Sequence, residues 1–276
     1  MSVTVKYKGS TIAELTENGT KTLKTSGKYC EADIVVENTK DGGGAAITDG
    51  IVVKARDANG KPTAADFYIS VLDANLLGER DSRSRYWLTE LTTANFINPI
   101  TDIKQYGLCF NSKLTGSYTF YVNGLNHQKT IYQCIALEGL SLPECASVAS
   151  QCVQNMSSLK TLYMPKCTSY ANVENSYAPF VNCTALETVQ LGSIGYSVGV
   201  LGKVSSGVMK SFVFNRCTQS GLTITLYCKG AEADTLLSNV RGNATNATII
   251  IKASENTTYN GVNYSAGDTM ITSEVA

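Results

Sequence analysis

An internal repeat in the second half of the chain constrains its fold more than any other feature. Residues 137–145, LEGLSLPEC, match residues 159–167, LKTLYMPKC, in the same frame. The frame returns at 186–191 and 209–217, and it begins one step earlier at 118–123. The first core positions of these copies are Tyr118, Leu140, Leu162, Val189 and Phe212. Successive copies therefore lie 22 to 27 residues apart.

This frame is the leucine-rich-repeat pattern, L-x-x-L-x-L-x-x-N/C, at its usual period. Each copy supplies one short strand whose apolar side cannot be buried alone, so stacked copies form a parallel ladder over a continuous core. In each copy the Asn or Cys turns the chain inward, where a small side chain or an amide fits. The predicted turn residues are Asn123, Cys145, Cys167 and Cys217.

The sequence as a whole predicts a mainly β protein. We expect a leucine-rich-repeat solenoid with a parallel strand ladder, preceded by a small β-hairpin N-terminal domain and closed by a small α/β C-terminal cap. The glycine run at 42–44 marks a break in composition and hence a linker. The expected parts are an N-terminal module at 1–40, a linker at 41–50, and a repeat domain at 51–276 with a hairpin or cap at 51–114, repeats at 115–228 and a C-terminal cap at 229–276.

Shorter elements are expected around the repeats. Alternating residues predict a hairpin formed by Ile51–Ala55 and Ala64–Val71. A strand is expected at Leu222–Leu226, and helical spacing of apolar residues predicts a helix at Ala231–Val240. Asn260-Gly261 then predicts a final hairpin turn.

Composition excludes several kinds of function. The chain has 23 Lys and Arg against 23 Asp and Glu, so it lacks the basic excess of a nucleic-acid-binding protein. Its single histidine, His127, and its nine cysteines without a C-x-x-C pair provide no zinc motif. No apolar run reaches the roughly 18 residues that span a bilayer, and the N-terminus lacks an apolar signal segment. We therefore expect no catalytic residue, metal, cofactor, nucleic-acid partner or membrane insertion.

Three of these segments resemble a known family. LEGLSLPEC, LKTLYMPKC and NCTALETVQL resemble the BspA-like leucine-rich repeats of bacterial surface proteins and bacteriophage genomes, over about residues 115–228. Residues 191–194, LGSI, depart from that pattern because they lack both the Pro and the Cys. Residues 3–39 are similar to a short module of structural proteins in phages of Gram-positive gut bacteria.

The resemblance implies a bacteriophage virion structural protein on the particle surface, made in the host cytoplasm. Its N-terminal module would bind virion proteins, and its solenoid would act in a fibre, receptor-binding or decoration component that binds a host-surface glycan or protein. A homo-oligomer is expected, and a trimer is one form of it. The alternative is a bacterial cell-surface leucine-rich-repeat adhesin. A glycan depolymerase is a further alternative, which would need two carboxylates around a cleft.

Candidate binding residues lie on the concave face of the repeats and in the loops. The face candidates are Glu138, Ser141, Lys160, Tyr163, Glu187, Gln190 and Lys210, and the loop candidates are Tyr170, Tyr177 and Tyr196. The face is interpreted either as a polar binding surface or as a cross-strand charge ladder that sets strand register. Tyrosine-rich loops are typical of adaptable recognition surfaces, but they also occur as ordinary connectors.

Overall fold

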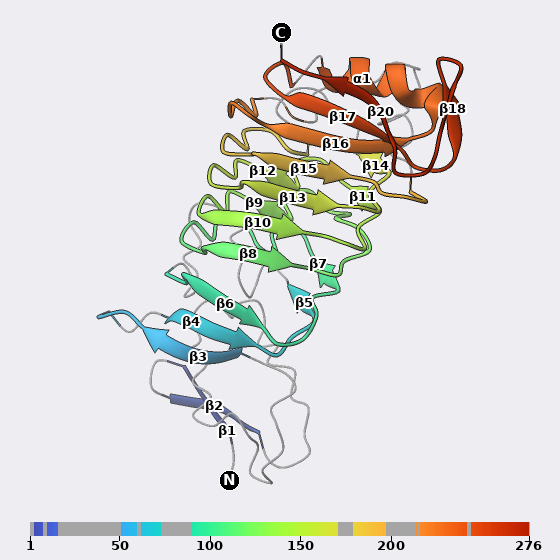
Figure 1. The fold of residues 1–276 in the computed structure, drawn as a ribbon. Coiled ribbons are helices and arrows are strands. Elements are labelled where there is room, and N and C mark those ends of the chain that lie inside the picture. The colour runs from blue at the N-terminus through green and yellow to red at the C-terminus, as the bar shows by residue number, and fades with distance from the viewer. Residues whose placement is uncertain are drawn as a thin grey trace.

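The computed structural model describes residues 3–7, 10–15, 51–59, 62–72, 90–170, 179–196, 214, 216–241 and 244–275. This part of the chain is mainly β, with one short α-helix, α1 (Ala233–Arg241), near the C-terminus. Short strands stack one above another into an elongated β-solenoid, with the two termini at opposite ends (Figure 1). The predicted solenoid with a parallel strand ladder is therefore confirmed.

The main sheet contains seven strands in the order β20-β17-β16-β15-β13-β10-β8. All neighbours pair in parallel except β17 and β20, which are antiparallel. The strands are β8 (Gly116–Thr119), β10 (Leu137–Ser141), β13 (Thr161–Met164), β15 (Thr188–Leu191), β16 (Thr223–Cys228), β17 (Thr248–Ala253) and β20 (Thr269–Ser273).

A smaller sheet lies below the main sheet in Figure 1. β3 (Ile51–Arg56) and β4 (Pro62–Phe67) form an antiparallel hairpin, as the sequence predicts, and β4 pairs in parallel with β6 (Thr93–Phe96). At the N-terminus, β1 (Val3–Tyr7) and β2 (Ser10–Leu15) form a separate antiparallel hairpin. The rest of the expected N-terminal module and the linker before residue 51 lie outside the described residues.

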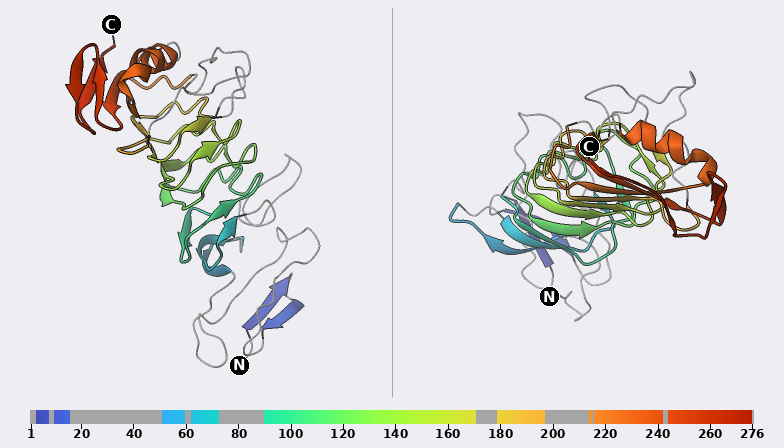
Figure 2. Two further views of the ribbon diagram at one scale, coloured as in Figure 1. Left: turned by 90° about the vertical axis from the view of Figure 1, so that its right-hand side faces the viewer. Right: turned by 45° about the horizontal axis from the view of Figure 1, so that its top comes forward.

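Further ladders of two-residue strands form the other sides of the solenoid (Figure 2). β11 (Ser147–Val148) pairs with β14 (Ser169–Tyr170), and β5 (Val71–Leu72) pairs with β7 (Asp102–Ile103) nearer the N-terminus. β9 (Ile131–Tyr132) pairs with β12 (Val153–Gln154). All three pairs are parallel, and the coil that begins at β10 passes through β11 and β12 before it returns to the main sheet at β13.

One residue per coil adopts a left-handed backbone just before the chain re-enters the main sheet. These residues are Phe110, Gln133, Asn155, Asn182 and Arg216, with φ between 58° and 61°. A buried residue follows each of them, namely Asn111, Cys134, Met156, Cys183 and Cys217. A left-handed non-glycine residue costs about 1–3 kcal/mol. Its recurrence in these five coils therefore indicates that the geometry of this corner requires it.

The structure corrects the repeat copy expected at 209–217. The main sheet passes directly from β15 to β16, so Val189 pairs with Ile224 rather than with Phe212. Phe212 lies outside the described residues, whereas the Phe214 ring stacks on Phe180 at 5.5 Å in a different side of the coil. The fifth strand of the ladder is therefore the segment that the sequence predicts as a strand at Leu222–Leu226.

The repeat copy at 209–217 was misplaced because the same hydrogen-bonded turn occurs at two different corners of a coil. After a main-sheet strand, Cys145 N–H donates to Leu142 O at 3.2 Å. Before such a strand, Cys217 N–H donates to Phe214 O in the same way at 3.1 Å. An apolar residue followed by Cys three positions later fits either corner, so the pattern alone does not distinguish them.

A single core fills the interior of the coils. The stacked positions that face it from the main sheet are Leu140, Leu162, Val189, Ile224 and Ile249, all at most 2% exposed. At the C-terminal end the cap consists of α1, the antiparallel strand β20, and the hairpin of β18 (Thr257–Tyr259) and β19 (Val262–Tyr264). The predicted helix and the predicted final hairpin turn are both confirmed.

Candidate functional site

Two columns of outward side chains on the main sheet form a regular array, which we call the sheet face. The outward Lys252 of β17, which pairs with Tyr227, lies beyond these columns. Strand register aligns two columns of six residues across β8, β10, β13, β15, β16 and β17. The first column is Ser117, Gly139, Thr161, Thr188, Thr223 and Thr248, and the second is Thr119, Ser141, Tyr163, Gln190, Thr225 and Ile250. None of these residues is charged, although 17% of the chain is.

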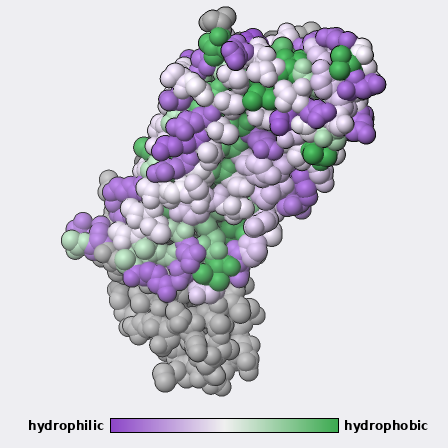
Figure 3. Space-filling model, viewed as in Figure 1, coloured by the Kyte–Doolittle hydropathy of each residue, from purple (hydrophilic) through white to green (hydrophobic). Residues whose placement is uncertain are grey.

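Hydroxyl, amide and aromatic groups dominate this surface. In Figure 3 it is mostly pale, with hydrophilic side chains gathered toward its sides. Tyr163 stands out from it with 41% of its surface exposed, next to Ser141 and Gln190 in the same column. The structure therefore brings together these three sequence-predicted candidates.

Gly139 allows the neighbouring side chains of the first column, Ser117 and Thr161, to approach each other closely. A Cβ at this position would overlap the Ser117 hydroxyl and stand 2.9 Å from Thr161 Oγ1. The side chains from the coils on either side therefore reach over Gly139, where only a residue without a side chain fits. This close approach makes the first column nearly continuous.

The predicted charged column lies beside the sheet face, at the start of the strands. Lys160 N–H donates to Glu138 O, and Glu187 N–H donates to Lys160 O, both at 2.8 Å, so the three residues are stacked as expected. All three side chains are exposed, and within the described residues no ion pair joins them. Lys210 lies outside the described residues. In the next coil the position stacked on Glu187 is Leu222, because Thr223 N–H donates to Glu187 O.

A second charged group flanks the other end of the strands. Lys166 forms an ion pair with Glu144, and its Nζ lies 5.6 Å from the centroid of the Tyr196 ring. The hydrogen bond to Glu144 raises the pKa of Lys166. Tyr196 is 42% exposed, so this loop candidate is accessible to a ligand.

Tyr170, expected in a binding loop, is instead part of the core. Its side chain is 5% exposed, its hydroxyl donates to Cys167 O at 3.4 Å, and its ring packs edge-on against Phe180 at 5.9 Å. Burial raises its pKa well above the usual value. Tyr170 occupies an inward position of β14 opposite Val148, which explains the difference. Tyr177 lies outside the described residues.

The predicted turn residues divide between two corners. Cys145 and Cys167 are buried at the corner that follows a main-sheet strand, where Cys145 Sγ–H donates to Ser147 O at 3.2 Å. Asn123 has the same position in its coil, but its side chain is exposed. Cys217 instead lies at the corner that precedes a strand. Its thiol donates to Phe180 O at 3.1 Å, as the Cys183 thiol does to Val153 O.

The thiols of the described residues are components of the core. All eight cysteines in this part of the chain are buried. Burial raises the pKa of Cys134 to about 12 and that of Cys152 to about 11, so both are protonated at neutral pH. In the same part of the chain no group of three or more His, Cys, Asp or Glu side chains could hold a metal ion.

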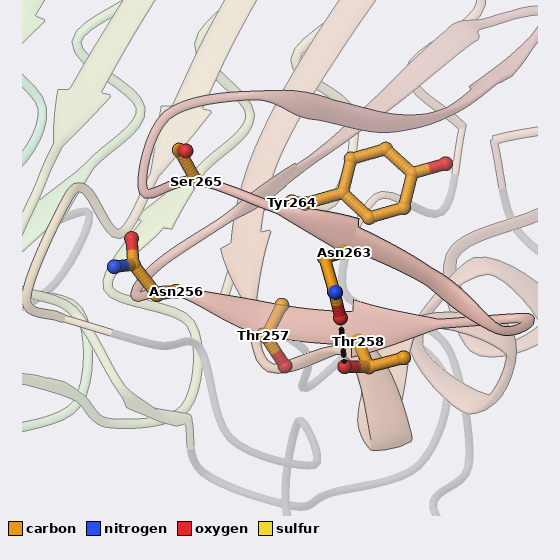
Figure 4. A pocket seen from close by; sticks show the side chains of 6 residues that line it. All are labelled: Asn256, Thr257, Thr258, Asn263, Tyr264 and Ser265. Atoms are coloured by element: carbon orange, nitrogen blue, oxygen red, sulfur yellow. Dashed lines mark hydrogen bonds between the residues drawn. The ribbon is translucent and has the colours of Figure 1, made fainter.

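The cap contains a pocket that sequence reasoning missed. It has a volume of about 340 Å³ and is lined by Asn256, Thr257, Thr258, Asn263, Tyr264 and Ser265 (Figure 4). The available signal was the Asn- and Thr-rich sequence around the Asn260-Gly261 turn.

Comparison with known proteins adds no identity to this geometry. No family model, curated protein or solved structure matches the chain. Among the described residues, no helix is long and apolar enough to cross a membrane. The class defined by the fold is therefore a capped parallel β-solenoid that displays an uncharged sheet face.

Proposed function

We propose that the chain is a surface-exposed attachment component of a bacteriophage particle, whose solenoid binds a host-surface glycan through the sheet face. The observation that carries this proposal is the uncharged, hydroxyl-rich sheet face with Tyr163 exposed at its centre. Hydroxyl and amide groups exchange hydrogen bonds with sugar hydroxyls, and an exposed aromatic ring offers a large contact area at low entropic cost. A solenoid surface that extends over several coils suits an extended polymer.

Two further parts of the proposal rest on the sequence. The even steps from Tyr118 to Leu140 and Leu162, which pair in adjacent strands, support coils of the BspA-like leucine-rich-repeat kind. The likeness of residues 3–39 to a phage module supports attachment to virion proteins, on the surface of a particle assembled in the host cytoplasm. Homo-oligomerisation, for example as a trimer, belongs to the same proposal.

A bacterial cell-surface adhesin would use the same surface on a different carrier. The position of the protein in an electron-microscopy map of a phage particle distinguishes the two: density for the solenoid on the particle supports the proposal, and its absence there together with the protein on intact bacterial cells supports the adhesin.

Binding is favoured over hydrolysis by the arrangement of the charges. Glu138 and Glu187 are separated by Lys160, and the twelve residues of the sheet face include no carboxylate. Release of reducing ends from host polysaccharide by the purified protein would contradict a purely binding role.

The binding experiment measures retention of the purified protein on isolated host cell-wall polysaccharide. Tyr163→Ala should lower retention at least about tenfold, which corresponds to about 1.4 kcal/mol. Ile135→Ala is the matched control, because Ile135 is 43% exposed and lies outside the sheet face. Equal retention of the two variants would refute the sheet face as the binding surface.

A further inference from the structure

The pocket in the C-terminal cap lies on a hairpin that is held rigidly. β18 and β19 are joined by Asn260 and Gly261, whose φ values of 50° and 77° define a tight two-residue turn. The hairpin packs on a short 3-10 helix, η3 (Gly230–Glu232), where Gly230 N–H donates to Thr257 Oγ1 at 3.0 Å. The Tyr259 hydroxyl also donates to Asp234 Oδ1 of α1 at 2.6 Å.

Gly230 fixes the distance between the hairpin and η3. A Cβ at this position would overlap the carbonyl oxygen of Thr258 and stand 2.8 Å from its carbonyl carbon. The two backbones are therefore in direct contact. A ligand that binds this hairpin pays little conformational entropy, because the hairpin is already ordered.

Each of the two amide side chains in the pocket uses its oxygen within the hairpin. Asn256 Oδ1 accepts a hydrogen bond from Ala266 N–H at 3.0 Å, and Asn263 Oδ1 accepts one from the Thr258 hydroxyl at 2.7 Å. These bonds orient both carboxamides, and Figure 4 shows the one between Thr258 and Asn263. Within the described residues neither NH₂ group has a hydrogen-bond partner, so each leaves two donors for a ligand.

Ser265 also has one polar group bonded within the cap and a second one available to a ligand. Its backbone N–H donates to Asp268 Oδ2 at 2.8 Å, and in this part of the structure its hydroxyl has no partner. The pocket thus offers two amide groups and one hydroxyl in fixed positions, with the half-buried Tyr264 beside them.

The chemistry of the lining selects the ligand. None of the six lining residues is charged, and Asp268, whose carboxylate accepts a hydrogen bond from Ser265 N–H, would repel an anion. A purely apolar ligand would leave the amide donors unpaired. The volume of about 340 Å³ is at the low end for ligand pockets. We propose that this pocket binds one neutral sugar unit, whose hydroxyls accept hydrogen bonds from Asn256 and Asn263.

This site is separate from the sheet face and does not depend on the proposed function. The sheet face is built from two columns of outward residues of β8 to β17, whereas the pocket belongs to β18, β19 and the segments that flank them. A glycan could therefore contact the protein at one site, at the other, or at both, and each site can be tested alone.

The experiment is a titration of the full chain, labelled with ¹⁵N, with glucose and N-acetylglucosamine, and with glucuronic acid as an anionic probe. The side-chain NH₂ resonances of Asn256 and Asn263 should shift with at least one neutral sugar and stay in place with glucuronic acid. Asn256→Asp and Asn263→Asp retain the oxygen acceptors and remove the donors, so each should weaken binding at least about fivefold, the worth of one hydrogen bond. Ser265→Ala, which adds no charge and leaves the backbone N–H in place, should weaken it less.

Asn126→Asp is the matched control, because Asn126 Oδ1 likewise accepts a hydrogen bond from a hydroxyl, that of Ser147 at 3.0 Å. Asn126→Asp and Tyr163→Ala should both bind the sugar as the parent protein does. The proposal is overturned if neither neutral sugar shifts the two resonances, if glucuronic acid binds equally well, or if Tyr163→Ala abolishes binding while both pocket variants retain it.

Discussion

Replacing Gly230 by alanine tests how firmly the cap hairpin is fixed to the solenoid. The new Cβ would overlap Thr258 O and stand 2.8 Å from the Thr258 carbonyl carbon, so one of the two backbones must move. Forcing an extra carbon into a packed contact costs about 1–3 kcal/mol. Displacement also weakens the hydrogen bond from Gly230 N–H to Thr257 Oγ1, worth about 0.5–1.5 kcal/mol. The expected total is about 2–4 kcal/mol.

The effect should be local, because coils of a solenoid contact only their neighbours. Hydrogen–deuterium exchange followed by mass spectrometry should show faster exchange in peptides that cover β18 and β19, with unchanged exchange in β10 and β13. Gly221→Ala is the control. A Cβ at Gly221 meets nothing within 4 Å, and its φ of 83° makes backbone strain the main cost. Unchanged exchange of the hairpin in Gly230→Ala would refute the direct backbone contact.

The remaining predictions concern the core, the thiols and the end of the main sheet. Leu162→Ala should destabilise the protein by about 2–5 kcal/mol in urea denaturation, because Leu162 is 2% exposed. Tyr163→Ala, at the neighbouring position, should change stability by at most about 0.5 kcal/mol. Similar losses for both variants would contradict the finding that Leu162 points into the core and Tyr163 points outward. The pKa of Cys134 is raised in the folded state to about 12, so its contribution to stability is complete below the ordinary thiol pKa near 9 and is lost as the pH rises from there toward 12. Circular dichroism melts between pH 8 and 11 should show this loss, and Cys134→Ala should make the dependence shallower; an identical slope would rule out Cys134 as a source. Arg241→Ala should lower stability by about 1–3 kcal/mol, because Arg241 donates to Ala247 O and Ser273 O, both at 2.6 Å. If the charge contributes, Arg241→Lys should have a melting temperature between those of Arg241→Ala and the parent. A melting temperature of Arg241→Ala equal to that of the parent would show that these bonds add nothing.

The register of the main sheet could be predicted because one pattern recurs on its strands. Tyr118, Leu140, Leu162 and Val189 are apolar or aromatic, face the core, and stand in the same frame, so they pair as the repeat predicts. The prediction was wrong where the apolar-x-x-Cys turn moved to another corner, at Phe214 and Cys217. The short strands on the other sides carry no comparable pattern, because two residues are too few for a period.

Side-chain type alone also left the candidate site incomplete. Tyr163 and Tyr170 are both tyrosines in strands of one coil, yet one is exposed and the other is buried. A tyrosine ring fits either environment when its hydroxyl finds a partner, as that of Tyr170 does at Cys167 O. The cap pocket depends on contacts between the hairpin and η3, about 27 residues apart, which no local sequence signal specifies.

The reversed direction of β20 limits how these molecules can associate. A parallel ladder that ended at β17 would present a row of unpaired backbone groups to which another chain could add a strand. β20 pairs with β17 in the antiparallel direction and so satisfies that row. The guanidinium of Arg241 donates hydrogen bonds to the carbonyl oxygens of Ser273 and Glu274. A strand of another chain therefore cannot add to β17 in the parallel sense of the coils, and the parallel ladder ends within the molecule.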